Sequence, residues 1–193
     1  VIEVNGFYIR GSGRVDDIKL LGSPSDGTIF EDAEDGDTKG WDIYDKSPSG
    51  SVIYNTYDAE RESRVIQFQG AGTQNGYRLR CEDGSPWHNS RQFTIQWSMR
   101  YAENFVVYID VETTSGHRYL YYTASNYDWL GNGEYVHHGL GYNVIDGQWH
   151  TFARDLEADL QGAQPGNRVI EVNGFYIRGS GRVDDIQLLN PNS

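Results

Sequence analysis

The sequence predicts an all-β protein, a two-sheet antiparallel β-sandwich of the jelly-roll type with at most one short helical turn. Composition is the first observation, since 23 Gly, 14 Tyr and 5 Trp indicate many turns and a polar aromatic surface. The second is the alternation of apolar and polar residues in several segments. The third is about nine such segments at short spacing without alternating helices, which favours two packed sheets.

Alternation is clearest in the middle of the chain. In FTIQWSMRY (93–101), Trp97 and four other large side chains occupy every second position, so we expect Trp97 in the core. FVVYIDVETT (105–114) alternates in the same way, and HRYLYYTA (117–124) follows after a Ser115-Gly116 turn. These three segments predict neighbouring half-buried strands.

The remaining segments complete the two sheets. Three earlier strands are predicted at 50–58, 64–70 and 75–81, and three later ones at 148–156, 169–179 and 181–189. Only EADLQGAQP (157–165) indicates a helical turn, because apolar residues four apart precede Gly162 and Pro165. Asn173-Gly174 is either a tight hairpin turn or a bulge within one longer strand, and we favour the bulge.

One phrase occurs at both ends of the sequence. Residues 1–21 and 169–189 are identical at 20 of 21 positions, differing only where Lys19 is replaced by Gln187. The spacing of 168 residues is that of a whole domain, so the parent is predicted to be a larger tandem-repeat protein. We expect 22–189 to be a complete domain, 1–21 the last strands of a preceding repeat, and 190–193 the start of a linker.

The first copy has two possible roles. It either packs loosely as the remnant of a domain junction, or it exchanges into a neighbouring copy as a donor strand. Alternating apolar residues in it would carry the exchange, which would give dimers or open fibres. They are Ile2, Val4, Phe7 and Ile9.

Charge and cysteine content restrict the partners. A net charge of −12 argues against nucleic acid and against an anionic membrane surface. No apolar run approaches the ~20 residues of a membrane-spanning helix, so no membrane partner is predicted. Cys81 is the single cysteine, which excludes an internal disulfide framework and is compatible both with the cytosol and with a bacterial surface protein.

The segment FEDAEDGDTKGW (30–41) is strongly acidic. Glu31, Asp32, Glu34, Asp35 and Asp37 lie within seven residues, and they would repel one another unless a cation or a basic partner is near. Oxygen ligands of this kind suit Ca²⁺, although the spacing is not that of an EF-hand. The alternative is a solvated acidic loop.

Two short motifs carry a resemblance. "FED" (30–32) before "GW" (40–41), and the final RVDDIQLL (182–189), resemble the first and last strands of β-jelly-roll carbohydrate-binding modules. The resemblance covers residues 29–189 and implies that these strands are neighbours with a structural calcium between them. It assigns Glu31 as the first-strand ligand and Asp184 or Asp185 as the last-strand ligand, with Asp35 and Asp37 nearby.

A glycan site needs flat aromatic rings beside polar side chains. Trp87 and His88 lie among turn residues in DGSPWHNS (83–90), so we expect both to be exposed. The aromatic segment 126–143 supplies four more candidates, which are Tyr127, Trp129, Tyr135 and His137. The alternative is that these rings fasten their loops to a sheet.

Catalysis is the least favoured function. The sequence has no nucleophile motif, phosphate loop or HExxH, and adjacent His137 and His138 point to opposite faces of a strand. We therefore predict a non-catalytic, extracellular or cell-surface repeat that binds a polysaccharide or cell-surface glycan, mediates adhesion and is stabilised by calcium. One alternative is a fibre subunit joined to neighbouring copies by the repeated phrase. The other is a polysaccharide lyase or hydrolase, which requires a groove lined by His, Tyr and Arg.

Overall fold

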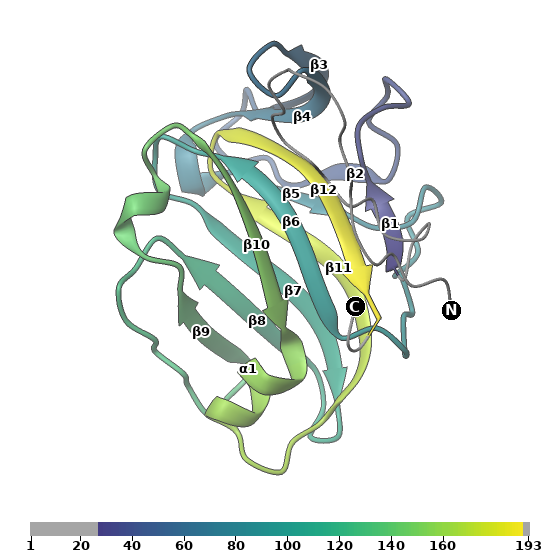
Figure 1. Ribbon diagram of the computed structural model, residues 1–193, viewed down its shortest axis with the longest axis vertical. Coiled ribbons are helices and arrows are strands. Elements are labelled where there is room, and N and C mark those ends of the chain that lie inside the picture. Colours follow the sequence, from purple (N-terminus) through teal and green to yellow (C-terminus); the bar gives the residue numbers. More distant parts are fainter. Residues whose placement is uncertain (1–26, 191–193) are drawn as a thin grey trace, which may run out of the picture.

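The computed structural model describes residues 27–190. They form twelve strands in two facing sheets, one α-helix and two 3₁₀ turns, which confirms the predicted β-sandwich (Figure 1). The strand-exchange residues Ile2, Val4, Phe7 and Ile9 lie outside the described residues. Within the described part of the chain, no helix is long and apolar enough to cross a membrane.

The first sheet, sheet A, has six strands, and its order is given by hydrogen bonding. Along the sheet lie β10 (Trp149–Asp155), β6 (Thr94–Arg100), β12 (Gly181–Leu189), β4 (Ser63–Gln69) and β3 (Val52–Asp58). The short β1 (Gly27–Glu31) pairs with the far end of β12, so the first described strand and the last one are neighbours, as the resemblance implied. All pairs in this sheet are antiparallel.

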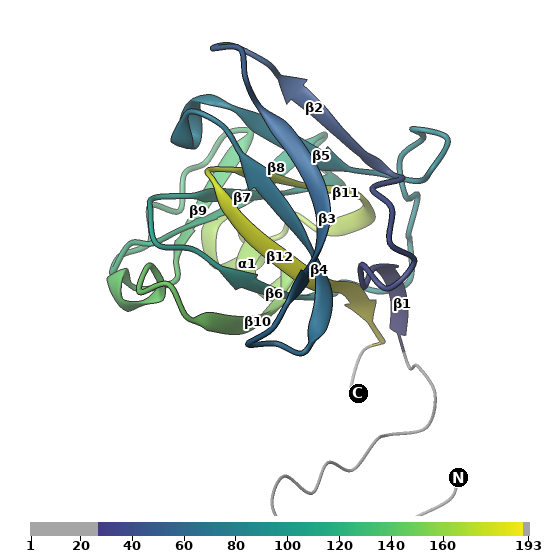
Figure 2. The same cartoon turned by 90° about the horizontal axis from the view of Figure 1, so that it is seen from above.

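Sheet B also has six strands and forms the opposite layer (Figure 2). Its order is β2 (Trp41–Asp45), β5 (Gly76–Leu79), β11 (Val169–Arg178), β7 (Val106–Thr113), β8 (Arg118–Thr123) and β9 (Tyr135–Gly139). The expected fully antiparallel arrangement is wrong at one place, because β8 and β9 run parallel. The cause is the connection 124–134, which returns the chain to the start of β8 before β9 begins.

The core lies between the two sheets and follows the alternation of the strands. Trp97 is fully buried, as predicted, and its ring packs against those of Tyr122, Phe152 and Phe175. Side chains on the opposite face of each strand point outward, since successive residues of a strand alternate. The burial of one face therefore fixes which residues the other face offers to a ligand.

The helix α1 (Leu156–Ala163) is longer than the single turn predicted from residues 157–165. Asp155 caps it, because its carboxylate accepts a hydrogen bond from the Ala158 amide. Leu156 and Leu160 are one turn apart and both are buried, which explains why the helix packs on the sandwich.

The second copy of the repeated phrase forms β11 and β12, an inner strand of each sheet. The register between β11 and β7 shifts between Val172 and Gly174, which confirms the bulge. Gly179 lies in the connection between the two strands with φ +113°, and a Cβ there would lie 2.9 Å from the Asn104 carbonyl oxygen. Glycine is therefore required where the chain crosses between sheets.

Candidate functional site

The outer face of sheet B is unusually rich in tyrosine. In β8, Leu120 and Tyr122 point into the core, so Tyr119 and Tyr121 point outward. The same alternation places Tyr108 of β7 and Tyr176 of β11 on this face. Strands with one buried side thus present a row of phenol rings on the other side.

A groove of about 340 Å³ crosses this face. Its lining comes from all six strands of sheet B and the residue after β5, and we call it the tyrosine groove. The lining residues are Tyr44, Arg78, Arg80, Tyr108, Tyr119, Tyr135, Tyr176 and Arg178. The groove therefore combines aromatic rings with guanidinium groups and depends on the order of the strands.

The rings in the groove support one another. Tyr119 stacks on Tyr135 with 5.4 Å between the ring centroids, and it meets Tyr176 edge to face at 5.9 Å. Tyr44 packs against Tyr176 at 5.5 Å and thereby extends the row to β2. Aromatic pairs at these separations are stabilising, so the rings form a platform that is held in place before a ligand arrives.

Each arginine in the groove has an acidic partner. Arg78 donates two hydrogen bonds to the carboxylate of Asp42, at 2.8 and 2.9 Å. Arg178 donates to Asp45 at 2.8 Å. Arg80 donates to the Tyr176 hydroxyl at 2.9 Å and lies 3.9 Å from the carboxylate of Asp110. These pairs hold the guanidinium groups in fixed orientations.

Asp110 lies buried behind the rings. It accepts a hydrogen bond from the Tyr176 hydroxyl at 3.1 Å, and its other oxygen is 3.0 Å from Nε2 of His117. The second ring nitrogen of His117 is 3.1 Å from Glu134. Asp110 thereby orients both the phenol and the imidazole.

Four phenols of the groove have raised pKa values and are neutral at neutral pH. Burial raises the pKa of Tyr44 and of Tyr119 to about 12. Burial also raises the pKa values of Tyr108 and Tyr176. Neutral phenols donate hydrogen bonds and stack on ligands, and they are poor bases, so the groove is better suited to binding than to abstracting a proton.

Two of the predicted glycan residues lie at or beside the groove. Tyr135 lines it and is 52% exposed. His137 is buried next to Tyr121, and its Nδ1 accepts a hydrogen bond from the Trp129 amide. His137 therefore fastens the 124–134 loop to β9, which is the alternative role considered for these rings, and burial lowers its pKa.

Tyr127 and Trp129 lie on the 124–134 loop beside β9. Both side chains are exposed, and Trp129, at 73%, has the larger exposed fraction. Tyr127 contacts the ring of His137 edge to face, with 6.4 Å between centroids. Neither residue lines the tyrosine groove.

The expected exposure of Trp87 is wrong. Trp87 is only 8% exposed, because Phe30 stacks on it at a centroid separation of 3.7 Å. His88 next to it is exposed and lies 2.9 Å from Glu171. Neither residue lines the tyrosine groove.

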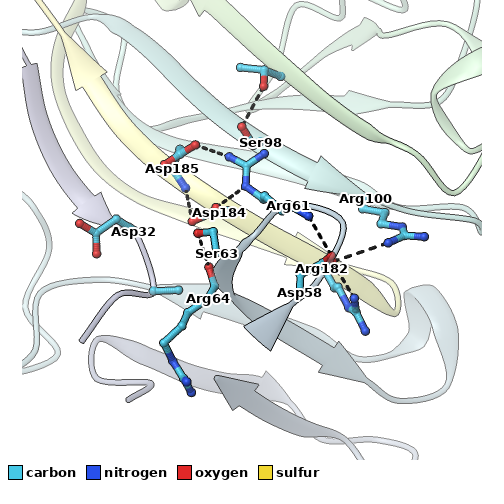
Figure 3. A network of polar contacts seen from close by, with 12 residues as sticks. Asp32, Asp58, Arg61, Ser63, Arg64, Ser98, Arg100, Arg182, Asp184 and Asp185 are labelled. Carbon is cyan, nitrogen blue, oxygen red and sulfur yellow. Dashed lines mark hydrogen bonds and ion pairs between the residues drawn. The ribbon is translucent and has the colours of Figure 1, made fainter. Parts of the chain in front are cut away.

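The predicted calcium ligands pair with other partners. Arg61 binds both Asp184 and Asp185 (Figure 3). Its guanidinium group also lies over the Trp149 ring, 4.6 Å from the ring centroid. Asp184 is 1% exposed, and burial raises its pKa to about 6. A guanidinium group therefore supplies the positive charge between the two aspartates.

Glu31 does not join this pair of aspartates. It accepts hydrogen bonds from Nε1 of Trp41 at 2.5 Å and from the Ala33 amide at 2.7 Å, and burial raises its pKa to about 7. Asp35 accepts from the Asp37 amide, and Asp37 pairs with Lys39. Within residues 27–190, no three His, Cys, Asp or Glu side chains gather to hold a metal ion, so the structure does not bring together the side chains that were expected to bind calcium.

Sequence reasoning missed most of the groove. Tyr108 and Tyr119 lie at the positions between the apolar residues that were assigned to the core, so the outward face of those strands was the available signal. Tyr44 and the whole of β2 gave no such signal, because WDIYD is too short for a clear alternation.

Solved carbohydrate-binding modules share this fold. A family 11 module from Clostridium thermocellum, in complex with a β-1,3-1,4-mixed-linked tetrasaccharide, has a TM-score of 0.50 at 12% identity, with 85% of this chain and 95% of that chain covered. A tandem pair of family 22 modules from Paenibacillus barcinonensis gives 0.46 at 12% identity, covering 86% and 49%. A family 35 module from the same organism gives 0.37 at 15% identity, covering 86% and 100%. The match to the family 11 module shows that the chain shares the jelly-roll fold of a carbohydrate-binding module.

No curated protein matches the chain. The sequence model described as D-glucuronyl C5-epimerase, beta-sandwich domain, matches residues 62–172. This match runs from the start of β4 into β11 and includes the segments that carry Arg78, Tyr108, Tyr119 and Tyr135. Because it covers more than half of the sequence, the chain belongs to the D-glucuronyl C5-epimerase β-sandwich domain family.

Proposed function

We propose that this chain is a non-catalytic module that binds a glycan along the tyrosine groove. The observation that carries the proposal is the platform of packed phenol rings across sheet B, flanked by oriented guanidinium groups. A sugar ring has an apolar C–H face and a rim of hydroxyls, so it matches a surface of flat rings with hydrogen-bond donors at its edges.

Three residues would carry most of the contact. The exposed ring of Tyr135 offers a stacking face, and Tyr119 beneath it keeps that ring in position. Arg78 lies beside Tyr176 and has N–H groups beyond the two that bind Asp42, since a guanidinium has five. A sugar that stacks on the Tyr135 ring could accept a hydrogen bond from Arg78 through one of its hydroxyls, without any movement of the strands.

Binding is favoured over catalysis by the state of the phenols. Lyases and epimerases that act on sugar rings need a base, and the raised pKa values of Tyr119 and Tyr176 oppose that role. Asp110 and His117 are engaged with each other and with neighbouring side chains.

We also propose that the module works outside the cell as one repeat of a longer protein. The support is the repeated phrase, since its second copy supplies an inner strand to each sheet of the sandwich. A nearly identical sequence at residues 1–21 is what a preceding domain of the same fold would contribute. Adhesion to glycan-coated surfaces would gain from several such modules, because linked sites raise avidity.

The test is binding to a panel of soluble polysaccharides by affinity electrophoresis and calorimetry, with Tyr135→Ala as the variant. Losing one stacking ring, at about 0.5–1.5 kcal/mol, should weaken binding by about 2- to 13-fold. Tyr54→Ala is the matched control, because Tyr54 is 46% exposed on β3 of sheet A. Equal weakening by both variants, or none by Tyr135→Ala, would contradict the proposal.

A further inference from the structure

An exposed aromatic surface lies next to the tyrosine groove, on the loop that precedes β9. Among residues 27–190, four of the nine exposed large hydrophobic side chains come from the segment 127–142. Trp129 is the most exposed of the nine, at 73%, and Tyr127 follows at 61%. Exposed hydrophobic side chains that gather in one place among polar residues mark a binding surface. We infer that Tyr127 and Trp129 form a second subsite, the loop platform, for a glycan chain that extends beyond the groove; this inference rests on the proposed glycan-binding function.

The backbone of this loop is held in place although the two rings are exposed. The Trp129 carbonyl accepts a hydrogen bond from the His137 amide, and Nδ1 of His137 accepts one from the Trp129 amide. The Asp128 carboxylate accepts a hydrogen bond from the Gly139 amide at 2.8 Å. These contacts fasten the loop to β9, the last strand of sheet B. The loop therefore needs little further ordering when a ligand binds, and preorganisation of this kind favours affinity.

A path of aromatic rings joins the groove to the loop platform. Tyr135 lines the groove, and His137 lies two residues further along β9 on the same face of the strand. The Tyr121 ring contacts both, with centroid separations of 6.3 Å to Tyr135 and 4.8 Å to His137. The Tyr127 ring follows at 6.4 Å from the His137 ring. A sugar chain that stacks on Tyr135 and continues along β9 therefore reaches the platform.

The platform offers the two kinds of contact that a sugar needs. The Tyr127 and Trp129 rings supply flat faces for C–H groups, and the exposed side chains of Asn126 and Asp128 lie beside them in the chain. Oδ1 of Asn126 accepts a hydrogen bond from the Tyr142 amide at 2.9 Å, and the same side chain has two N–H donors for sugar hydroxyls. The ligand class is therefore a polysaccharide chain long enough to occupy both the groove and the platform.

The experiment compares Trp129→Ala with Tyr135→Ala on ligands of different length. Mixed-linkage β-glucan, xylan, polygalacturonate and hyaluronan are the polymers, each with its fragments from the disaccharide upward, and calorimetry gives the Kd. The short ligand is the smallest fragment whose binding Tyr135→Ala weakens. Trp129→Ala should weaken polymer binding by about 2- to 13-fold, the range for one aromatic contact, and binding of the short ligand by less than about 2-fold. Tyr57→Ala is the matched control, because Tyr57 is 59% exposed on β3 of sheet A.

Tryptophan fluorescence gives a second readout that needs no substitution. All five tryptophans lie within residues 27–190, and Trp129 is the one that is exposed. Quenching by acrylamide therefore reports mainly on this ring. A bound polymer should reduce the quenching, whereas the short ligand should leave it unchanged. Trp129→Phe should keep most of the polymer affinity, because it retains an aromatic face.

The two proposals fail in different ways. Polymer binding that weakens in Tyr135→Ala but not in Trp129→Ala, with unchanged quenching, would leave the groove as the glycan site and refute the platform. Equal losses in Trp129→Ala for polymer and short ligand, or an equal loss of polymer binding in Tyr57→Ala, would also refute the platform. Losses in Trp129→Ala without any in Tyr135→Ala would refute the groove and its continuation together. The absence of binding to every polymer would refute the glycan-binding function and, with it, the platform.

Discussion

Replacing Arg61 by alanine tests how the end of sheet A is held together. Arg61 bridges Asp184 and Asp185 of β12 (Figure 3). Its guanidinium group also lies over the Trp149 ring. Asp184 is almost fully buried. Alanine at position 61 leaves this carboxylate in the protein interior without its positively charged partner.

The size of the effect follows from that burial. Removing one partner of a buried ion pair costs about 3–5 kcal/mol, because the remaining charge loses its compensation. The pair with Asp185 is half exposed and adds little. The lost cation–π contact adds about 0.5–1 kcal/mol. For a chain of this size, each kcal/mol corresponds to about 2–4 °C, so the Tm should fall by about 7–24 °C.

The assay is thermal unfolding followed by circular dichroism at pH 7, together with urea unfolding. Arg168→Ala is the control, because Arg168 forms an exposed ion pair with Glu157 and should cost less than about 1 kcal/mol. Arg61→Lys should be intermediate, since an ammonium group cannot bind two carboxylates in the planar geometry of a guanidinium. A Tm loss in Arg61→Ala no larger than in Arg168→Ala would refute the reasoning.

Three further predictions concern pH, calcium and the repeated phrase. Burial raises the pKa of Glu31 in the folded protein from 4.5 to about 7, so the protonated side chain stabilises the fold below about pH 4.5 and this contribution is lost as the pH rises through 7. Glu31→Gln should therefore flatten the dependence of Tm on pH between pH 5 and 8, and an unchanged slope would contradict this. Because Arg61 already supplies a positive charge to Asp184, EDTA should lower the Tm by less than about 1 °C. A larger fall in Tm that added calcium reverses would support the structural calcium site predicted from the sequence. Deleting residues 1–21 should leave the Tm unchanged and the protein monomeric by light scattering, because the second copy of the phrase already forms β11 and β12 of the sandwich. Open polymers of the full chain that disappear on deletion would favour strand exchange.

The sequence by itself determined the features that depend on neighbours along the chain. The alternation within 93–101 was sufficient to predict that Trp97 is buried, because the side chains of a half-buried strand alternate with a period of two. Two leucines four residues apart, followed by Pro165, were enough to place α1. The bulge at Asn173-Gly174 was also a local signal, since glycine there interrupts the alternation.

Only the tertiary structure decided which residues meet. Trp87 looks exposed among turn residues, but Phe30, 57 positions earlier, covers it. Arg61 pairs with Asp184, which lies 123 residues later in the chain, so no local sequence pattern predicts this ion pair. Tyr44 and Tyr176 share a groove only because β2, β5 and β11 are adjacent, and strand order is set by the packing of the whole sandwich. Short-range patterns fix the face on which a side chain lies, and long-range pairing fixes its neighbours there.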